Sequence, residues 1–201
     1  MCVVSLLSVK MFKRFLQITS VGLSLIALAG CFGFGGNDEV VVQDLPVDQY
    51  ALHESGAYRI NYPIGWQVRT DFSGDIERAT EVAFVSNVKE VFFTPVVTVA
   101  SQPVGSEVTS RDFALNIIEQ NKQILVAYNE LERTEVATVD GEGVLVRFTG
   151  KTEAADSPVE YLQTYHVSAD RGYVITGAHD PNGDPLLFER LVDSVRSFVL
   201  R

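Results

Sequence analysis

The sequence has few of the residues that most often carry catalysis or bind metals. Its 201 residues include three histidines, two cysteines and one tryptophan. The histidines, His53, His166 and His179, lack the spacing of a metal-binding motif. No Gly-x-Ser-x-Gly segment is present, and no glycine-rich phosphate loop lies between a predicted strand and a predicted helix. We therefore expect a protein without catalytic residues and without a cofactor.

Basic residues are also scarce, and this excludes one class of partner. The chain carries 16 Lys and Arg against 26 Asp and Glu, a formal net charge of −10. Residues 1–30 contain three of the basic residues and no acidic one, so residues 31–201 have a net charge of −13. Nucleic acids and anionic lipid head groups are bound through Lys and Arg. We therefore expect no nucleic-acid partner.

The two cysteines are explained by a predicted signal peptide. Lys13 and Arg14 precede the apolar segment 21–30, which is too short to span a bilayer comfortably. A basic start followed by such a segment is typical of a cleavable signal over residues 1–30. Cleavage removes Cys2 and leaves Cys31 as the first residue of the mature chain and its single thiol.

Residues 28–31, Leu-Ala-Gly-Cys, resemble the lipobox of bacterial lipoproteins, in which a leucine and two small residues precede an acylated cysteine. The resemblance implies that Cys31 carries a diacylglycerol on its sulfur and can carry a further chain such as palmitate on its amine. Two or more chains give stable anchoring. The mature protein would then be held at a membrane in the cell envelope, facing the periplasm or the exterior. Phe32, in place of Asp, favours the outer membrane if the cell is Gram-negative.

A flexible tether is predicted over residues 31–47. Its first part is rich in glycine, at residues 33–36, and a flexible chain of this length spans roughly 20–25 Å. The apolar residues 40–42 (Val-Val-Val) interrupt this polar stretch. They are either a first strand or a docking segment. The folded domain is predicted over residues 48–201.

Alternating apolar residues predict strands in the first half of this domain. The expected strands cover residues 58–62, 66–68, 82–86 and 96–103. Ser110 is expected to cap a helix. The apolar residues that recur at helical spacing after it are Phe113, Ile117, Ile118, Leu125 and Tyr128.

The second half contains a clear hairpin signal. Asp140-Gly141 separates predicted strands over residues 134–139 and 142–149. A second antiparallel pair is expected over residues 159–168 and 173–178. An amphipathic helix then places on one face Leu187, Phe188, Leu191, Val192, Val195 and Phe198. The order of elements predicts an α+β fold in which an antiparallel β-sheet is flanked by helices.

Two segments carry a family resemblance. Residues 58–66 (Tyr-Arg-Ile-Asn-Tyr-Pro-Ile-Gly-Trp) and residues 188–198 resemble an aromatic strand and the final helix of PsbP/Mog1-like domains, which include cyanobacterial lipoprotein relatives of PsbP. The predicted mid-chain helix and the long meander resemble these domains as well. The resemblance covers residues 48–201. It implies an α/β/α sandwich and a non-enzymatic role in binding or assembling a protein complex. In the photosynthetic branch of the family the partner is photosystem II.

One polar segment suggests a cation site. Asp180, Asn182 and Asp184 alternate as at the start of a calcium loop, but Glu189 falls short of the twelfth-position ligand. The same residues, with flanking prolines, make a turn before the last helix. We favour the turn and keep the metal site as an alternative.

Aromatic residues offer two further candidates. Phe92 and Phe93 are adjacent, and neighbouring residues of a strand cannot both point into one core. They are either an exposed partner-contact loop or a bulge between buried strands. Tyr58, Tyr62 and Trp66 could form a ligand platform but are expected in the core.

The leading interpretation is a tethered, non-catalytic envelope lipoprotein that binds or helps assemble a protein complex. The alternative is a lipoprotein that binds a small ligand or a divalent cation.

Overall fold

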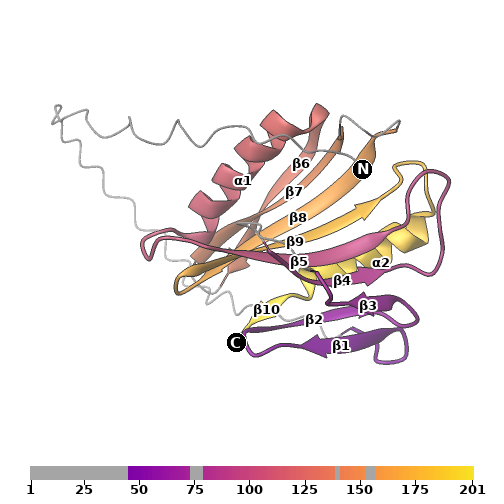
Figure 1. Ribbon diagram of the computed structural model, residues 1–201, viewed down its shortest axis with the longest axis horizontal. Coiled ribbons are helices and arrows are strands. Elements are labelled where there is room, and N and C mark those ends of the chain that lie inside the picture. Colours follow the sequence, from indigo (N-terminus) through magenta and orange to yellow (C-terminus); the bar gives the residue numbers. More distant parts are fainter. Residues whose placement is uncertain (1–44, 73–78, 139–140, 153–156) are drawn as a thin grey trace, which may run out of the picture. The chain divides into compact units, whose positions relative to one another are not determined.

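The computed structural model describes residues 45–72, 79–138, 141–152 and 157–201 (Figure 1). The predicted signal peptide, Cys31, residues 40–42 and Asp140 lie outside the described residues. Within the described part of the chain, no helix is both long enough and apolar enough to cross a membrane.

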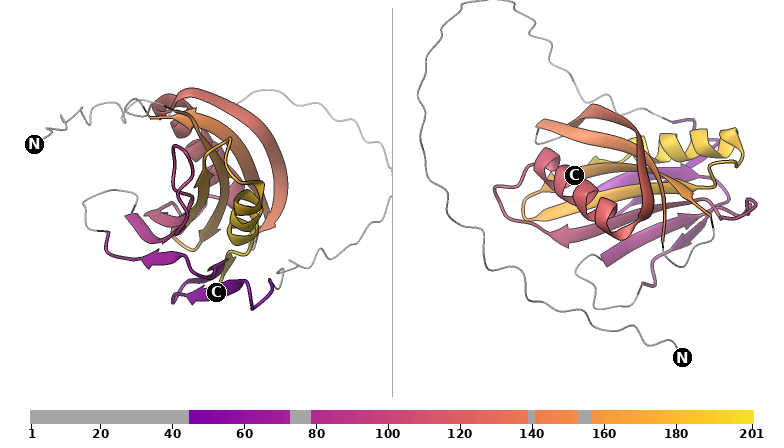
Figure 2. Two further views of the ribbon diagram at one scale, coloured as in Figure 1. Left: turned by 90° about the vertical axis from the view of Figure 1, so that its right-hand side faces the viewer. Right: turned by 90° about the horizontal axis from the view of Figure 1, so that it is seen from above.

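Most strands form one antiparallel sheet of seven, in the order β3-β4-β5-β9-β8-β7-β6. A smaller sheet has the order β1-β2-β10 and is also antiparallel. Figure 2 gives two further views of the sheets and helices. The strands are β1 (Tyr50–Glu54), β2 (Tyr58–Pro63), β3 (Gln67–Arg69), β4 (Ala79–Val85), β5 (Val96–Pro103), β6 (Val126–Thr138), β7 (Gly141–Lys151), β8 (Val159–Ser168), β9 (Arg171–His179) and β10 (Val199–Leu200).

The two helices, α1 (Ser110–Ile124) and α2 (Pro185–Arg196), cover opposite faces of the large sheet. Because side chains alternate along a strand, β9 serves both faces. Ile175 belongs to the core beneath α2, with Leu191 and Val195. Val174 belongs to the core beneath α1, with residues that include Phe113, Ile117, Val144, Val146 and Phe148. This arrangement confirms the predicted α+β fold with helices flanking an antiparallel sheet.

Two glycines of β9 allow the helices to approach closely. A Cβ atom built on Gly172 would lie 2.6 Å from the Phe113 ring of α1. A Cβ atom on Gly177 would lie 1.9 Å from the Leu191 side chain of α2. Residues 172 and 177 face opposite sides of the sheet. At each glycine, one helix therefore packs directly against the backbone of β9.

The predicted mid-chain helix is too long. Thr109 is the N-cap, Ser110 is the first helical residue, and the helix ends at Ile124. Tyr128 belongs to β6, and the intervening Ala127 has a left-handed φ of 56°. The helical spacing extended to Tyr128 because its ring packs on Phe148, in the core that α1 covers.

Strand β6 begins eight residues earlier than residue 134. It is an edge strand exposed on most of both faces, so its first half lacks the apolar alternation by which a strand is recognised. The hairpin itself is present, since Thr138 pairs with Gly141. Strands β1 and β10 were not predicted, because they are short and are stabilised by β2.

Candidate functional site

The clearest candidate for a contact surface is the loop between β4 and β5. It contains Val91 and Phe92, which are 73% and 66% exposed, and the half-buried Phe93. The loop does not belong to either strand, so the structure places the aromatic pair in an exposed connection. Large apolar side chains in such a position are typical of a surface that meets another molecule.

Two carboxylates hold this loop in place. Glu90 accepts hydrogen bonds from the backbone N–H groups of Asp180, at 2.8 Å, and Asp184, at 2.9 Å. In return, Asp180 accepts a bond from the Phe92 N–H at 3.1 Å. We call Glu90 and Asp180 the reciprocal clasp. Each carboxylate binds the backbone of the other loop, and hydrogen bonds to a charged acceptor are stronger than neutral ones.

The reciprocal clasp explains why residue 183 is a glycine. A Cβ atom on Gly183 would lie 1.9 Å from Oε1 of Glu90. The Glu90 side chain therefore enters the 180–184 turn through space that only glycine leaves open. The Gly183 N–H also donates to the Asp180 carbonyl at 2.8 Å, which closes the turn.

The three residues of the predicted cation loop have structural hydrogen bonds. Asp180 is 2% exposed, and its carboxylate accepts bonds from Phe92 N–H and, at 2.9 Å, from Asn182 N–H. Asp184 is the N-cap of α2 and accepts the Leu186 N–H at 2.9 Å, ahead of Pro185 in the first turn. This is the arrangement that the turn interpretation predicts. Across the described ranges, no three His, Cys, Asp or Glu side chains converge as a metal site.

A pocket of about 290 Å³ lies beside the aromatic pair. Phe92 and Phe93 form one wall, and the start of β8 with the residues before it forms the other. The lining residues on that second wall are Thr152, Ser157, Pro158, Val159 and Tyr161. The pocket thus combines apolar and aromatic surfaces with the hydroxyl-bearing residues Thr152, Ser157 and Tyr161.

A row of stacked rings extends from this pocket across the sheet. Tyr161 of β8 stacks on Phe148 of β7 at 5.1 Å between centroids, and Phe148 stacks on Tyr128 of β6 at 4.9 Å. Burial raises the pKa of Tyr161, and burial together with the Glu130 carboxylate raises the pKa of Tyr128 to about 12. Both phenols are therefore neutral at physiological pH.

The opposite face of the same sheet end holds a buried polar cluster. The Glu160 carboxylate accepts a bond from Arg147 Nε, and His179 Nε2 lies 3.6 Å from the same carboxylate oxygen. Phe188 of α2 covers both partners, 4.5 Å from the His179 ring and 4.9 Å from the Arg147 guanidinium. Both ring nitrogens of His179 are buried without a hydrogen-bond partner. The cluster supports the strand end from which Asp180 emerges.

A second polar cluster joins β4, β5 and β9 around the buried Ser101, and its Arg171 and Glu81 side chains are partly exposed. Ser101 donates to Glu81 and accepts from Arg171 Nη1 at 2.8 Å. Burial, reinforced by the Glu81 carboxylate, raises the pKa of Tyr58. Ser101 is 2% exposed, so its hydroxyl is closed to a substrate as the protein stands. We interpret the cluster as structural.

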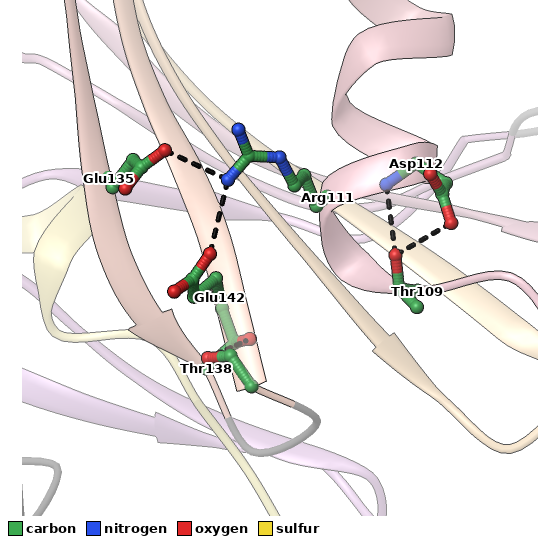
Figure 3. Close-up of polar contacts among 7 residues, drawn as sticks. Thr109, Arg111, Asp112, Glu135, Thr138 and Glu142 are labelled. Carbon is green, nitrogen blue, oxygen red and sulfur yellow. Dashed lines mark hydrogen bonds and ion pairs between the residues drawn. The ribbon is translucent and has the colours of Figure 1, made fainter. Parts of the chain in front are cut away.

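An exposed network ties α1 to the β6–β7 hairpin (Figure 3). Arg111 Nη1 lies 2.8 Å from Glu135 and 3.2 Å from Glu142. At the helix start, the Thr109 hydroxyl accepts the Asp112 N–H at 3.1 Å. Exposed pairs of this kind contribute little stability, so the network orients the hairpin more than it stabilises the fold.

The structure describes three of the four remaining residues that the sequence singled out. Tyr58 and Trp66 are in the core, as expected, and Tyr62 stacks on Phe84 at 4.5 Å. Cys31 lies outside the described residues, so its lipidation stays a prediction. Glu90 was not singled out from the sequence, because its partners lie about 90 residues away and no local pattern marks them.

Comparisons with known proteins identify the fold. No family model matches the chain, and no curated protein matches it. The solution structure of cyanobacterial PsbP (CyanoP) from Synechocystis sp. PCC 6803 is similar, with a TM-score of 0.57 and 10% sequence identity. The match covers 79% of this chain and 96% of CyanoP.

A crystal structure of PA94 from Pseudomonas aeruginosa, a protein of unknown function, is also similar, with a TM-score of 0.53 and 12% identity. That match covers 76% of this chain and 98% of PA94. Identities this low carry information about the fold alone. The chain has a PsbP-like α+β fold.

Proposed function

We propose that this protein is a membrane-tethered, extracytoplasmic lipoprotein that binds a protein of the cell envelope without catalysis. The Phe92–Phe93 loop and the pocket beside it are the binding surface. Lipidation of Cys31 supplies the tether. The lipobox-like residues 28–31 and the preceding signal-like segment support the tether.

The observation that carries the binding role is an apolar loop held in an exposed position by backbone hydrogen bonds. Phe92 is 66% exposed, yet its own N–H is fixed by a buried carboxylate of the reciprocal clasp. Preorganised aromatic side chains make effective anchors because little conformational freedom is lost on binding. A loop without a partner would gain nothing from such an arrangement.

The chemistry of the surface defines the partner. An aliphatic or aromatic side chain fits the pocket between Phe93 and Tyr161. The net charge of −13 over residues 31–201 attracts a segment that carries Lys or Arg beside that anchor. The partner is therefore a basic segment with an apolar anchor residue, presented at the membrane to which the tether leads.

The tether is tested first. Cys31→Ala should release the protein from the membrane fraction and abolish incorporation of labelled fatty acid. Retention of both properties in the Cys31→Ala variant contradicts lipidation at this residue.

The binding surface is tested with a photo-crosslinking amino acid at position 92 in intact cells, and at Leu131 as a matched control. Leu131 is 46% exposed and lies on edge strand β6. We expect one adduct of defined mass from position 92, weakened by high salt and by Tyr161→Ala. Equal adducts from both positions, or adducts indifferent to Tyr161→Ala, contradict the proposal.

A further inference from the structure

A second pocket, of about 570 Å³, lies on the small sheet formed by β1, β2 and β10. Its volume is within the range of pockets that bind small molecules. Leu52 of β1 and the β2 residues Arg59 and Asn61 line it. Side chains alternate along a strand, so these three lie on the face opposite the buried Tyr58 and Ile60. The pocket is therefore separate from the hydrophobic core.

One side of this pocket is apolar. Leu52 is 51% exposed, and Val47, on the segment before β1, is 90% exposed. Leu45 lines the pocket as well. Removing apolar surface from water is favourable, so these side chains suit the apolar part of a ligand.

The other side is polar and is fixed by the end of α2. The Ser197 hydroxyl accepts the Asn61 N–H at 2.8 Å and donates to the Ser194 carbonyl at 2.8 Å. The Tyr50 hydroxyl donates to the Asp193 carboxylate at 2.8 Å. Burial, reinforced by Asp193, raises the pKa of Tyr50, so this hydroxyl stays protonated. These bonds join β1 and β2 to α2 and hold the polar wall in place.

Arg59 supplies a cation to the pocket. Glu54 lies opposite Arg59 in the β1–β2 pairing, but the Glu54 carboxylate accepts a hydrogen bond from Arg201, which follows β10. Within the described ranges, neither the Arg59 guanidinium nor the Asn61 side-chain amide has a hydrogen-bond or ion-pair partner. Two sets of donors on one face of β2 are therefore left for an external acceptor. A guanidinium binds the two oxygens of a carboxylate particularly well.

We propose that this pocket binds a small amphipathic carboxylate. The carboxylate accepts hydrogen bonds from Arg59 and Asn61, and the apolar part of the molecule packs against Leu52 and Val47. Charge complementarity supports this choice, because the guanidinium favours an anion at this point of an otherwise acidic domain. The site is distinct from the partner surface at Phe92 and does not rest on the proposed function.

The test measures how fast a maleimide reacts with an introduced thiol in the full chain, in mild neutral detergent, with Cys2→Ser and Cys31→Ser. Leu52→Cys probes the pocket, and Leu131→Cys on β6 is the control, since both side chains are about half exposed. Octanoate is the ligand probe, and octanamide is its uncharged analogue. We expect octanoate to slow labelling of Leu52→Cys in a saturable way and to leave Leu131→Cys unchanged.

Recognition of the carboxylate is tested in the Leu52→Cys background. Arg59→Gln should raise the octanoate concentration that gives half of the protection by at least about tenfold, the effect of losing a hydrogen bond to a charged group. Arg69→Gln, which removes an exposed arginine of β3, should leave this concentration unchanged. With Arg59 in place, octanamide should protect at least about tenfold more weakly than octanoate.

Equal protection by octanoate and octanamide, or protection that Arg59→Gln does not weaken, overturns the proposal. Equal slowing of Leu131→Cys shows a general effect of octanoate on the detergent and overturns it as well. Val47→Cys serves as a second probe if Leu52→Cys disturbs the fold or the site. Labelling that octanoate slows at neither position also contradicts the proposal.

Discussion

Glu90 and Asp180 each bind the backbone of the other's loop. The Glu90 carboxylate accepts the Asp180 N–H at 2.8 Å, and the Asp180 carboxylate accepts the Phe92 N–H at 3.1 Å. Two carboxylates of an acidic protein thus exchange hydrogen bonds with the backbone of each other's loop. Backbone N–H groups supply the positive ends of dipoles that make this arrangement stable.

Removing one member of the clasp should destabilise the protein. Glu90→Ala leaves the partly buried Asp180 N–H without its acceptor, and an unsatisfied buried polar group costs about 1–3 kcal/mol. The Asp184 N–H is exposed and can donate to water instead. Urea unfolding measures the loss. The control is Glu107→Ala at an exposed position, which should change stability by less than about 0.5 kcal/mol. A Glu90→Ala loss no larger than that of the control contradicts a stabilising clasp.

Gly183→Ala should be destabilising for a specific reason, the 1.9 Å approach of its Cβ to Oε1 of Glu90. The cost should therefore depend on Glu90. In a double-mutant cycle, we expect Gly183→Ala to destabilise the protein by at least about 0.5 kcal/mol less in the Glu90→Ala background than in the native one. Additive effects of the two substitutions show that Gly183 is required for another reason.

His53 should make stability depend on pH. Burial lowers the pKa of His53 from its usual 6.5, so the folded state disfavours the imidazolium form. The unfolded state then binds more protons, and stability falls as the pH drops below 6.5 toward the lowered folded pKa. Urea unfolding at pH 7.5 and pH 5.5 should show a smaller fall for His53→Gln than for the native chain. An identical fall in both proteins contradicts the prediction.

His179→Phe should be tolerated. The ring stacks on Phe188 at 4.5 Å, and both of its nitrogens are buried without hydrogen bonds. A phenyl ring keeps the stacking and removes two unsatisfied polar atoms, so we expect stability unchanged or raised by about 1 kcal/mol. The matched variant Glu160→Leu leaves Arg147 without its carboxylate and should be destabilising. A large loss in His179→Phe would show that the 3.6 Å approach to Glu160 matters.

Local sequence patterns predicted the strands and helices whose apolar residues repeat at the spacing of a strand or of a helix. The strand predicted over residues 159–168 coincides with β8, which is buried on both faces and flanked by turn residues. Edge strand β6 was predicted only from residue 134, because exposure on both faces removes the alternation. Tyr128 was assigned to the preceding helix because its ring packs on Phe148, in the core that α1 covers.

The candidate site could be predicted only in part. Phe92 and Phe93 stood out because adjacent aromatics do not suit a buried strand. The hydrogen bonds that hold this loop could not be predicted, since Glu90 and Asp180 are 90 residues apart. Glu90 was not singled out, and Asp180 was considered only as a cation ligand or a turn residue. The second wall of the pocket comes from the start of β8, and it meets the loop only after the sheet has formed.

Strand β9 lies inside the large sheet and is shared by both hydrophobic cores, with Val174 facing one and Ile175 facing the other. Disruption of either core removes side-chain packing from β9, which pairs with β5 and β8. The two cores should therefore unfold as a single cooperative unit. Trp66 reports on the core beneath α2, whereas tyrosines lie in both cores, and we expect tryptophan and tyrosine fluorescence to change at the same denaturant concentration.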